Sequence, residues 1–261
     1  MTSHGKLRSL PKRLRVLDLC TGSGCIPLHF HGELYKKEGA SEVALELVGV
    51  DVSTQALNLA EENNAVQLNS QLTERSESCM AHSLRGIRFL QANVLSEGDA
   101  AAPPLAKALQ GISHPNAPPE YDILISNPPY ISTKAFRTTT SASVKRYEPK
   151  LALVPPPSST NEMLEDGDLF YPRLLETADT VKAKVVLFEV ADLSQAKRVA
   201  MMAVGRAVWD RVEIWRDEPT GHTPGDEANL LIGGSTVRIL GQGHGRTVVA
   251  YRGFGTALFS E

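Results

Sequence analysis

The chain has 261 residues, of which 42% are hydrophobic and 22% charged, the balance of an ordinary globular protein. Its formal net charge of −3 excludes the overall positive field that holds nucleic acid without sequence preference. The 3 cysteines form no CxxC pair, so neither a disulfide framework nor a zinc site is expected, and we predict no metal. No apolar run approaches the roughly 20 residues of a membrane span.

A basic segment opens the chain. Residues 1–14 carry lysine and arginine but no acidic residue. This composition fits a solvated tail, and it equally fits the remnant of a mitochondrial presequence, since such peptides are basic and poor in acids.

Beyond this segment, short apolar runs alternate with longer helical stretches. Strands are expected at 14–19, 45–50, 87–91, 121–126, 185–190, 211–215 and 247–251. A helix should follow the first strand to about residue 37, and Ser53 should cap a helix that ends near residue 66. Because helices separate the strands, we expect an α/β fold with a parallel sheet covered on both faces.

Polar segments interrupt this alternation and are longer than ordinary connections, which indicates functional loops or insertions. They lie near 69–83, 100–119, 133–160 and 217–246. Within the third, the stretch 133–147 carries four cations and no acid: Lys134, Arg137, Lys145 and Arg146. This stretch fits an anion-facing loop or a solvated flexible one.

The first chemical motif is the glycine-rich turn after the first strand, Asp18 to Gly24. Its glycines let the backbone turn sharply and let a ligand lie against it, and the following helix offers unpaired N–H groups. A tight turn without a ligand has the same composition. The turn is not the GxGxxG dinucleotide fingerprint, because Ile26 and Pro27 fill the region of the third glycine.

Asp51 ends the second expected strand. A carboxylate at that place, one βαβ unit after a glycine-rich turn, can accept hydrogen bonds from the two hydroxyls of a ribose. Aspartate is also a common turn residue at a strand end.

The most specific signal is Asn127-Pro128-Pro129-Tyr130, directly after the fourth expected strand. The two prolines stiffen the loop and remove two N–H donors. The side-chain carbonyl of Asn127 and the backbone carbonyl of Pro128 can together accept both hydrogens of an NH₂ group. Tyr130 can lie over the flat group that carries it.

Six segments now point to a family: DLCTGSG (18–24), VGVD (48–51), ISNPPYIS (125–132), YEPKLAL (147–153), EDGDLFYPRLL (165–175) and FEVADLSQA (188–196). On these segments the chain resembles the class I S-adenosylmethionine-dependent methyltransferases. Within them it resembles the HemK/PrmC family, the glutamine methyltransferases of peptide-chain release factors. NPPY alone is shared with DNA and RNA amino-methyltransferases, whereas the later blocks are more particular to this family.

The resemblance implies a class I methyltransferase Rossmann-like fold, with a seven-stranded, mostly parallel sheet, helices on both faces and an antiparallel C-terminal strand. It implies S-adenosylmethionine as cofactor. The family segment around the methionine part of the cofactor corresponds to Cys20, Thr21, Gly22, Ser23 and Gly24. The ribose-binding acid corresponds to Asp51, and the adenine region to Asn93 and Val94.

The loop that takes the substrate amide in the family corresponds to Asn127, Pro128, Pro129 and Tyr130. Of these, Asn127, Pro128 and Tyr130 are the expected catalytic residues, and Asn127 is also expected beside the cofactor. The implied reaction is direct transfer of methyl from sulfonium to nitrogen, without a metal or a covalent enzyme intermediate. The amide is activated by position and electrostatics, so we assign no general base to Glu148 or Glu189.

The chain also departs from the family pattern. Cys20 stands where the family has the first glycine of the turn, and Asn93 where an acid is common. We expect a basic tail at residues 1–14 and one methyltransferase domain at residues 15–261. We expect the family's helical N-terminal substrate domain to be absent.

The leading hypothesis is therefore a methyltransferase that acts on N5 of the glutamine in the Gly-Gly-Gln loop of a release factor. The alternatives are a DNA or RNA adenine or guanine amino-methyltransferase, and a non-enzymatic module that retains the cofactor fold. The long insertions and the form of the turn resemble fungal members, whose substrate is the mitochondrial release factor. We therefore expect a mitochondrial location, with the cytoplasm as alternative, a release factor as partner, no membrane, and a monomer.

Overall fold

The computed structural model describes residues 11–72, 79–95, 102–112, 119–157, 165–220, 228–253 and 255–256. The chain divides into two compact units, one of residues 1–124 and 253–261 and the other of residues 125–252. Residues 1–10, most of the expected basic tail, lie outside the described residues.

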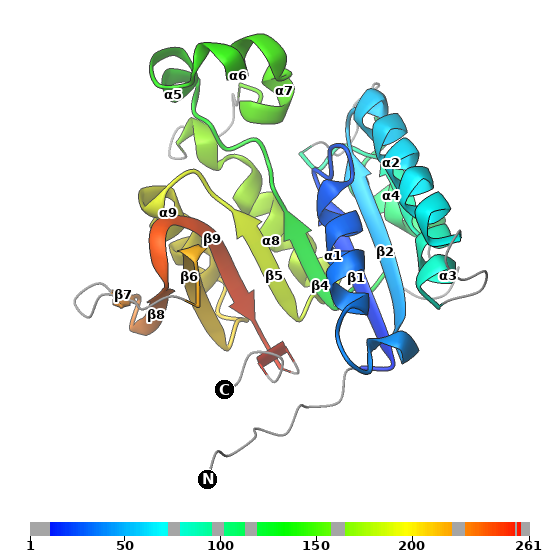
Figure 1. Ribbon diagram of the computed structural model, residues 1–261. Helices are drawn as coiled ribbons and strands as arrows, with labels where there is room; N and C mark the ends of the chain where they lie inside the picture. Colours follow the sequence, from blue (N-terminus) through cyan, green and yellow to red (C-terminus); the bar gives the residue numbers. More distant parts are fainter. Residues whose placement is uncertain are drawn as a thin grey trace. The chain divides into compact units, whose positions relative to one another are not determined.

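The first unit is built on three parallel strands in the order β3-β2-β1. Figure 1 shows β1 and β2 side by side. The strands are β1 (Arg13–Leu19), β2 (Ala44–Asp51) and β3 (Arg88–Gln91). The helices are α1 (Cys25–Tyr35), η1 (Ala40–Glu42), α2 (Thr54–Leu72), α3 (Cys79–Arg85) and α4 (Leu105–Ile112). This strand order is that of a Rossmann-like half-sheet.

Burial explains why β1 and β2 are rich in apolar residues. Val16, Leu17 and Leu19 on β1 and Val50 on β2 are fully buried, because α1 packs against β1 and β2 while α2 and α3 pack against β2. The polar residues that follow each strand therefore come at the carboxyl ends of a buried parallel sheet, which is where such folds bind ligands.

Strand β4 (Ile123–Ser126) begins in the first unit and leads into the second. The second unit contains β5 (Val185–Glu189), β6 (Arg211–Glu218), β7 (Asn229–Ile232), β8 (Ser235–Leu240) and β9 (Gln242–Tyr251), in the order β5-β9-β6-β8-β7. Its helices are α5 (Thr133–Thr138), α6 (Ala142–Tyr147), α7 (Lys150–Leu153), η2 (Asp166–Asp168), α8 (Phe170–Thr180) and α9 (Leu193–Gly205).

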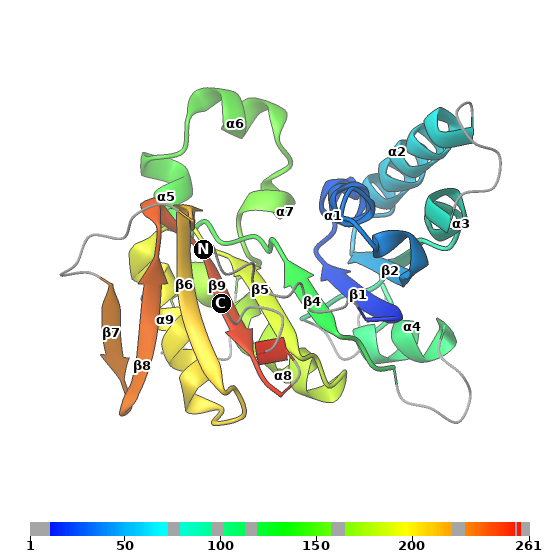
Figure 2. The same ribbon diagram turned by 60° about the horizontal axis from the view of Figure 1, so that its bottom comes forward.

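The last strand, β9, lies between β5 and β6 and is antiparallel to both (Figure 2). This arrangement confirms the expected α/β fold with an antiparallel C-terminal strand, although the sheet is mixed rather than mostly parallel. The helices after the first strand and after Ser53 are also present, and the Ser53 hydroxyl accepts the Ala56 N–H at 3.2 Å as a helix cap. The expected end of the second helix near residue 66 is wrong, since α2 continues to Leu72.

The expected count of seven strands is wrong, since the described residues form nine. The two extra strands, β7 and β8, are an antiparallel hairpin inside the segment interpreted as an insertion near 217–246. Gly233 and Gly234 join them with φ of +55° and +83°, the left-handed conformation that a two-residue hairpin turn requires. A Gly-Gly pair between two short apolar runs was the signal for it.

The three other polar segments also contain regular structure. The segment 69–83 holds the end of α2 and most of α3. The segment 100–119 holds α4, whose Leu105 and Leu109 are buried. The segment 133–160 holds α5, α6 and α7, three short helices without a buried residue. Ser132 and Ser141 cap the first two of these helices by accepting the N–H groups of Ala135 and Val144.

Candidate active site

The glycine-rich turn joins β1 to α1 in the first unit. Gly24 adopts φ +75°, and a Cβ there would lie 2.9 Å from the Cβ of Ala60, so only glycine fits. The turn is closed by the Gly24 N–H, which donates to the Thr21 carbonyl at 3.0 Å. At Gly22, by contrast, a Cβ would meet no atom within 4 Å, so the turn has an open side against which a ligand can lie.

Cys20 is half-buried and adopts a left-handed conformation, with φ +61°. Glycine adopts this conformation without cost, whereas it costs a residue with a Cβ about 1–3 kcal/mol. The cysteine that replaces glycine at position 20 therefore strains the backbone of the turn.

Asp51 connects the end of β2 to this turn. One carboxylate oxygen accepts the Gly22 N–H at 2.8 Å, and the other accepts the Ser53 N–H at 2.9 Å. The turn role weighed for Asp51 is thus present in the structure. A carboxylate has about four lone-pair positions, so it can still accept hydroxyl groups, and its ribose-binding role stays a prediction.

Asn93 and Val94 follow β3 and are half-buried. The side-chain oxygen of Asn93 accepts the Leu95 N–H at 2.9 Å, and its backbone N–H donates to the Pro103 carbonyl at 3.0 Å. The oxygen expected to face an adenine amine therefore also closes a local turn, and one lone pair remains for a ligand.

Asp18, at the end of β1, is a candidate that the sequence analysis left out of the site. It is fully buried, and one carboxyl oxygen accepts the Thr21 hydroxyl at 2.5 Å. Its other oxygen has no hydrogen-bond partner among the described residues. Burial, with a smaller contribution from the charge of Asp51, raises the pKa of Asp18 to about 7, although the Thr21 hydroxyl opposes the shift.

These features fit a ligand that carries both an ammonium group and a diol. The buried oxygen of Asp18 without a partner would be satisfied by a cationic donor, and Asp51 offers lone pairs to hydroxyl groups. Asp18 could have been identified from the sequence in the same way as Asp51, because both are acids near the end of an apolar strand.

The raised pKa of Asp18 predicts a pH dependence of stability. The folded protein keeps the proton up to about pH 7, whereas the unfolded chain releases it near its ordinary pKa of about 3.9. The contribution of Asp18 is therefore present at low pH and is lost as pH rises toward 7, at up to about 1.4 kcal/mol per pH unit.

Denaturant unfolding of the wild type and of Asp18→Asn, from pH 4.5 to 8, measures this contribution. The stability of the wild type relative to the variant should fall as pH rises. A difference that stays constant over this range would show that Asp18 is not protonated in the fold.

The NPPY loop, residues 127–130, follows β4 in the second unit. Pro128 and Pro129 are buried, Tyr130 is half-buried, and Asn127 is exposed. The Asn127 side chain forms no hydrogen bond with any other residue that the structure describes. Its carbonyl oxygen is thus available to an incoming NH₂ group, and its role in binding the substrate stays a prediction.

Tyr130 is held at its far end. Its hydroxyl donates to Oε1 of Glu189 at 3.0 Å. Burial, followed by the negative charge of Glu189, raises the pKa of Tyr130 to about 12. The phenol therefore stays protonated at neutral pH, and Tyr130 can cover a substrate but cannot act as a base.

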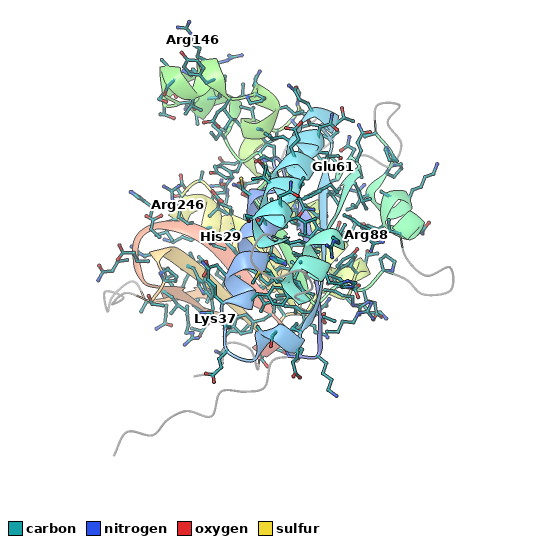
Figure 3. The ribbon with its side chains drawn as sticks, turned by 45° about the vertical axis from the view of Figure 1, so that its right-hand side comes forward. His29, Lys37, Glu61, Arg88, Arg146 and Arg246 are labelled. Carbon is teal, nitrogen blue, oxygen red and sulfur yellow. The ribbon has the colours of Figure 1, made fainter. Side chains whose placement is uncertain are left out.

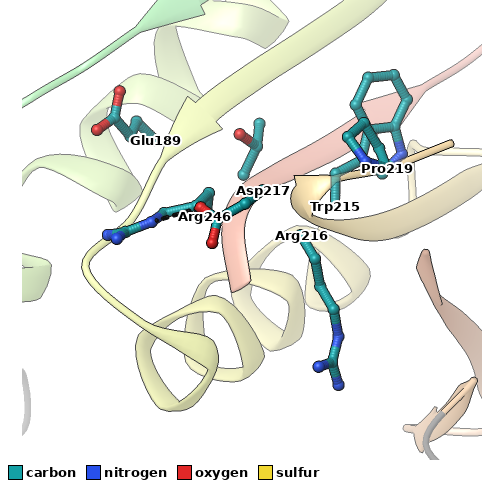
Figure 4. Close-up of a pocket in the computed structure, with 7 residues that line it drawn as sticks. Glu189, Trp215, Arg216, Asp217, Pro219 and Arg246 are labelled. Carbon is teal, nitrogen blue, oxygen red and sulfur yellow. Dashed lines mark hydrogen bonds and ion pairs between the residues drawn. The ribbon is translucent and has the colours of Figure 1, made fainter. Parts of the chain in front are cut away.

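Glu189 also lines a pocket of about 330 Å³ in the second unit. The lining residues are Glu189, Trp215, Arg216, Asp217, Pro219, Arg246 and Thr247. Figure 4 shows Arg246 beside Asp217, and their side chains form an ion pair of 2.9 Å. The guanidinium of Arg246 also donates to the Ala191 carbonyl at 3.2 Å, so this wall of the pocket is fixed by two contacts.

The four cations expected in a loop lie instead on helices α5 and α6, where Arg146 points outward (Figure 3). The Lys145 ammonium lies 5.8 Å from the centre of the Phe136 ring. Glu148 is exposed, and its backbone N–H ends α6 by donating to Val144.

Among the described residues, no three histidines, cysteines or acids gather as a metal site. None of the helices described has the length and apolar character that a bilayer crossing requires.

The chain is similar in sequence to several curated methyltransferases. No protein-family model matches the chain. It is 34% identical to the probable MRF1 mitochondrial N(5)-glutamine methyltransferase mtq1 of Schizosaccharomyces pombe, over 72% of this chain and 51% of that protein. It is 30% identical to the release factor glutamine methyltransferase of Bacteroides thetaiotaomicron, over 64% of this chain and 42% of that protein.

Among solved structures, the catalytic domain of human METTL16 in complex with an RNA hairpin aligns with a TM-score of 0.46 and 13% identity. This alignment covers 91% of this chain and 63% of that one. The chain spans about half or less of the length of the curated relatives named above. These relatives bear out the resemblance carried by the six sequence segments: the chain is a homologue of the release factor glutamine methyltransferases.

Proposed function

We propose that the chain is an S-adenosylmethionine-dependent methyltransferase that acts on the side-chain amide nitrogen of a glutamine. The acceptor is the glutamine in the Gly-Gly-Gln loop of a peptide-chain release factor. The observation that carries the proposal is the NPPY loop, in which Tyr130 is anchored and the amide of Asn127 is exposed and without a described partner. The names of the curated relatives support the same acceptor.

S-adenosylmethionine, when bound, supplies an electrophilic methyl group on a sulfonium. In the first unit, the glycine-rich turn would lie along its methionine part, and Asp51 would accept from its ribose. The buried oxygen of Asp18 would accept from its ammonium group. Asn93 and Val94 would border its adenine.

In the second unit, the acceptor amide would be held by the NPPY loop. The Asn127 and Pro128 carbonyls would accept its two hydrogens, which draws electron density toward the nitrogen and orients it. The ring of Tyr130 would cover the flat amide. Catalysis would then be positioning and electrostatics, and no base is needed before the transfer, because the amide proton can leave afterwards.

The fungal relatives are named as mitochondrial, which supports a mitochondrial location for this chain as well, with the cytoplasm as alternative. We also propose that it acts as a monomer and that residues 15–261 form its methyltransferase domain. Fractionation of the source cells tests the location. Size-exclusion chromatography with light scattering tests the monomeric state.

The acceptor assay decides between a protein and a nucleic acid. A release factor incubated with the chain and S-adenosylmethionine should gain the mass of one CH₂ on the tryptic peptide that contains the Gly-Gly-Gln glutamine. Replacement of that glutamine should abolish the gain. Labelled adenine or guanine in added RNA or DNA, with an unmodified release factor, would favour the alternative of a nucleic-acid amino-methyltransferase.

Asp51→Ala should weaken the binding of S-adenosylmethionine, measured by titration calorimetry. The change removes an acceptor for ribose hydroxyls, and a hydrogen bond to a charged group contributes about 1.5–3 kcal/mol. It also removes the acceptor of two backbone N–H groups, so the melting temperature should fall. Asp122→Ala is the matched control, because Asp122 accepts the Arg15 N–H at 2.8 Å without belonging to the turn. Equal cofactor affinity in the two variants would leave Asp51 with its turn role alone.

Asn127→Ala should leave cofactor affinity and melting temperature nearly unchanged and lower kcat by about 10²–10³, the usual cost of one positioned polar group. Stability should not change because the side chain is exposed and makes no hydrogen bond among the described residues. Asn69→Ala, at an exposed position on α2, is the control for loss of an asparagine. Full activity of Asn127→Ala would contradict the assignment of the loop.

A further inference from the structure

We infer that Gln195 is a positioning residue for methyl transfer, because its buried side-chain amide holds the backbone of the NPPY loop at Tyr130. Asp168 and Gly167 complete this support. The inference rests on the proposed function, since it takes the NPPY loop as the place where the acceptor amide binds.

The side chain of Gln195 lies on α9 and is only 3% exposed. Its Nε2 donates to the carbonyl of Tyr130 at 3.3 Å, to the carbonyl of Gly167 at 3.0 Å and to Oδ1 of Asp168 at 2.9 Å. Its Oε1 accepts the Ala191 N–H at 2.8 Å. All polar atoms of this amide are thus used, and one of its two hydrogens is shared between acceptors.

Asp168 fixes which way the Gln195 amide faces. Its carboxylate is 1% exposed and accepts from Nε of Arg198 at 2.5 Å and from Nη2 at 3.0 Å. A flipped amide would place Oε1 against this carboxylate and two carbonyls, and would set Nε2 against the Ala191 N–H. The donor of Gln195 is therefore locked toward the Tyr130 carbonyl.

Gly167 brings the supporting backbone close to the same carbonyl. A Cβ at Gly167 would lie 2.5 Å from the Tyr130 oxygen, so a larger residue would have to displace the loop or the turn. Here glycine is required by close approach, because its φ lies outside the left-handed region.

Two further bonds hold this end of the loop. The Tyr130 hydroxyl donates to Glu189, and the Ile131 N–H donates to the Leu153 carbonyl at 2.9 Å. Only Pro128 and Pro129, each with a fixed φ, separate Tyr130 from the exposed Asn127. A carbonyl held at Tyr130 therefore limits the positions that the Asn127 amide can reach.

Gln195→Met tests the inference, because methionine keeps the volume but forms none of the four hydrogen bonds. Gln67→Met is the matched control: Gln67, on α2, is half-buried, and its amide donates to the Leu28 carbonyl at 3.5 Å. Amide hydrogen exchange should become at least tenfold faster in the peptide that contains Ile131 for Gln195→Met, and should stay unchanged there for the control.

Kinetics with the release factor distinguish positioning from general stability. For Gln195→Met we expect kcat to fall about 10- to 100-fold, because small misplacements of reacting groups cost up to about 10²-fold. Cofactor affinity should stay within twofold, and the folded fraction, followed by circular dichroism, should stay complete. Gly167→Ala, which presses on the Tyr130 carbonyl while the Gln195 amide remains, should show the same pattern.

Each outcome decides a separate point. Unchanged exchange around Ile131 in Gln195→Met, or faster exchange with kcat equal to that of the control, overturns the inference. If Gln195→Met does not fold, Gly167→Ala decides by the same two measurements. If the wild type does not methylate the release factor, the proposed function fails, while the exchange data still decide whether Gln195 holds the loop.

Discussion

The carboxylate of Asp51 is the contact on which the candidate cofactor region depends. It ties the end of β2 to the Gly22 N–H of the preceding turn and to the Ser53 N–H before α2. Two segments that are far apart in sequence are thereby fixed at the carboxyl end of the parallel strands. The strained backbone of Cys20 and the close approach of Gly24 to Ala60 lie in this same turn.

The second unit fixes the NPPY loop in a comparable way. Strand β4 ends at Ser126, and beyond it the loop is held by two side-chain contacts and by the backbone hydrogen bond from Ile131 to the Leu153 carbonyl. Gln195 supplies a donor to the Tyr130 carbonyl, and Glu189 supplies an acceptor to the Tyr130 hydroxyl. Buried polar groups of this kind are costly unless they are fully paired, and each polar atom of the Gln195 and Asp168 side chains has a hydrogen-bond partner.

The sequence predicted the elements that depend on a local residue pattern, namely the buried strands and the NPPY loop. Buried parallel strands appear as apolar runs, so β1, β2 and β5 were placed to within a residue or two, and the prolines of the NPPY loop are visible in one line of sequence. The hairpin β7-β8 was missed although its Gly-Gly turn is local, because the run before it is only four residues long. Gln195 could not be found by spacing, since its partner Tyr130 is 65 residues away. In the sequence, Gln195 is visible only as one position of the segment 188–196, which resembles the family.

The two candidate regions differ in how their residues divide between structure and chemistry. Asp51 and Asn93 hold the backbone with the same oxygens that would meet the cofactor, so selection for folding and for binding act on the same atoms. Asn127 makes no such contact among the described residues, so folding places no demand on its amide. Since stability alone would accept many residues at this exposed place, a substitution of Asn127 tests the proposed acceptor role without disturbing the fold.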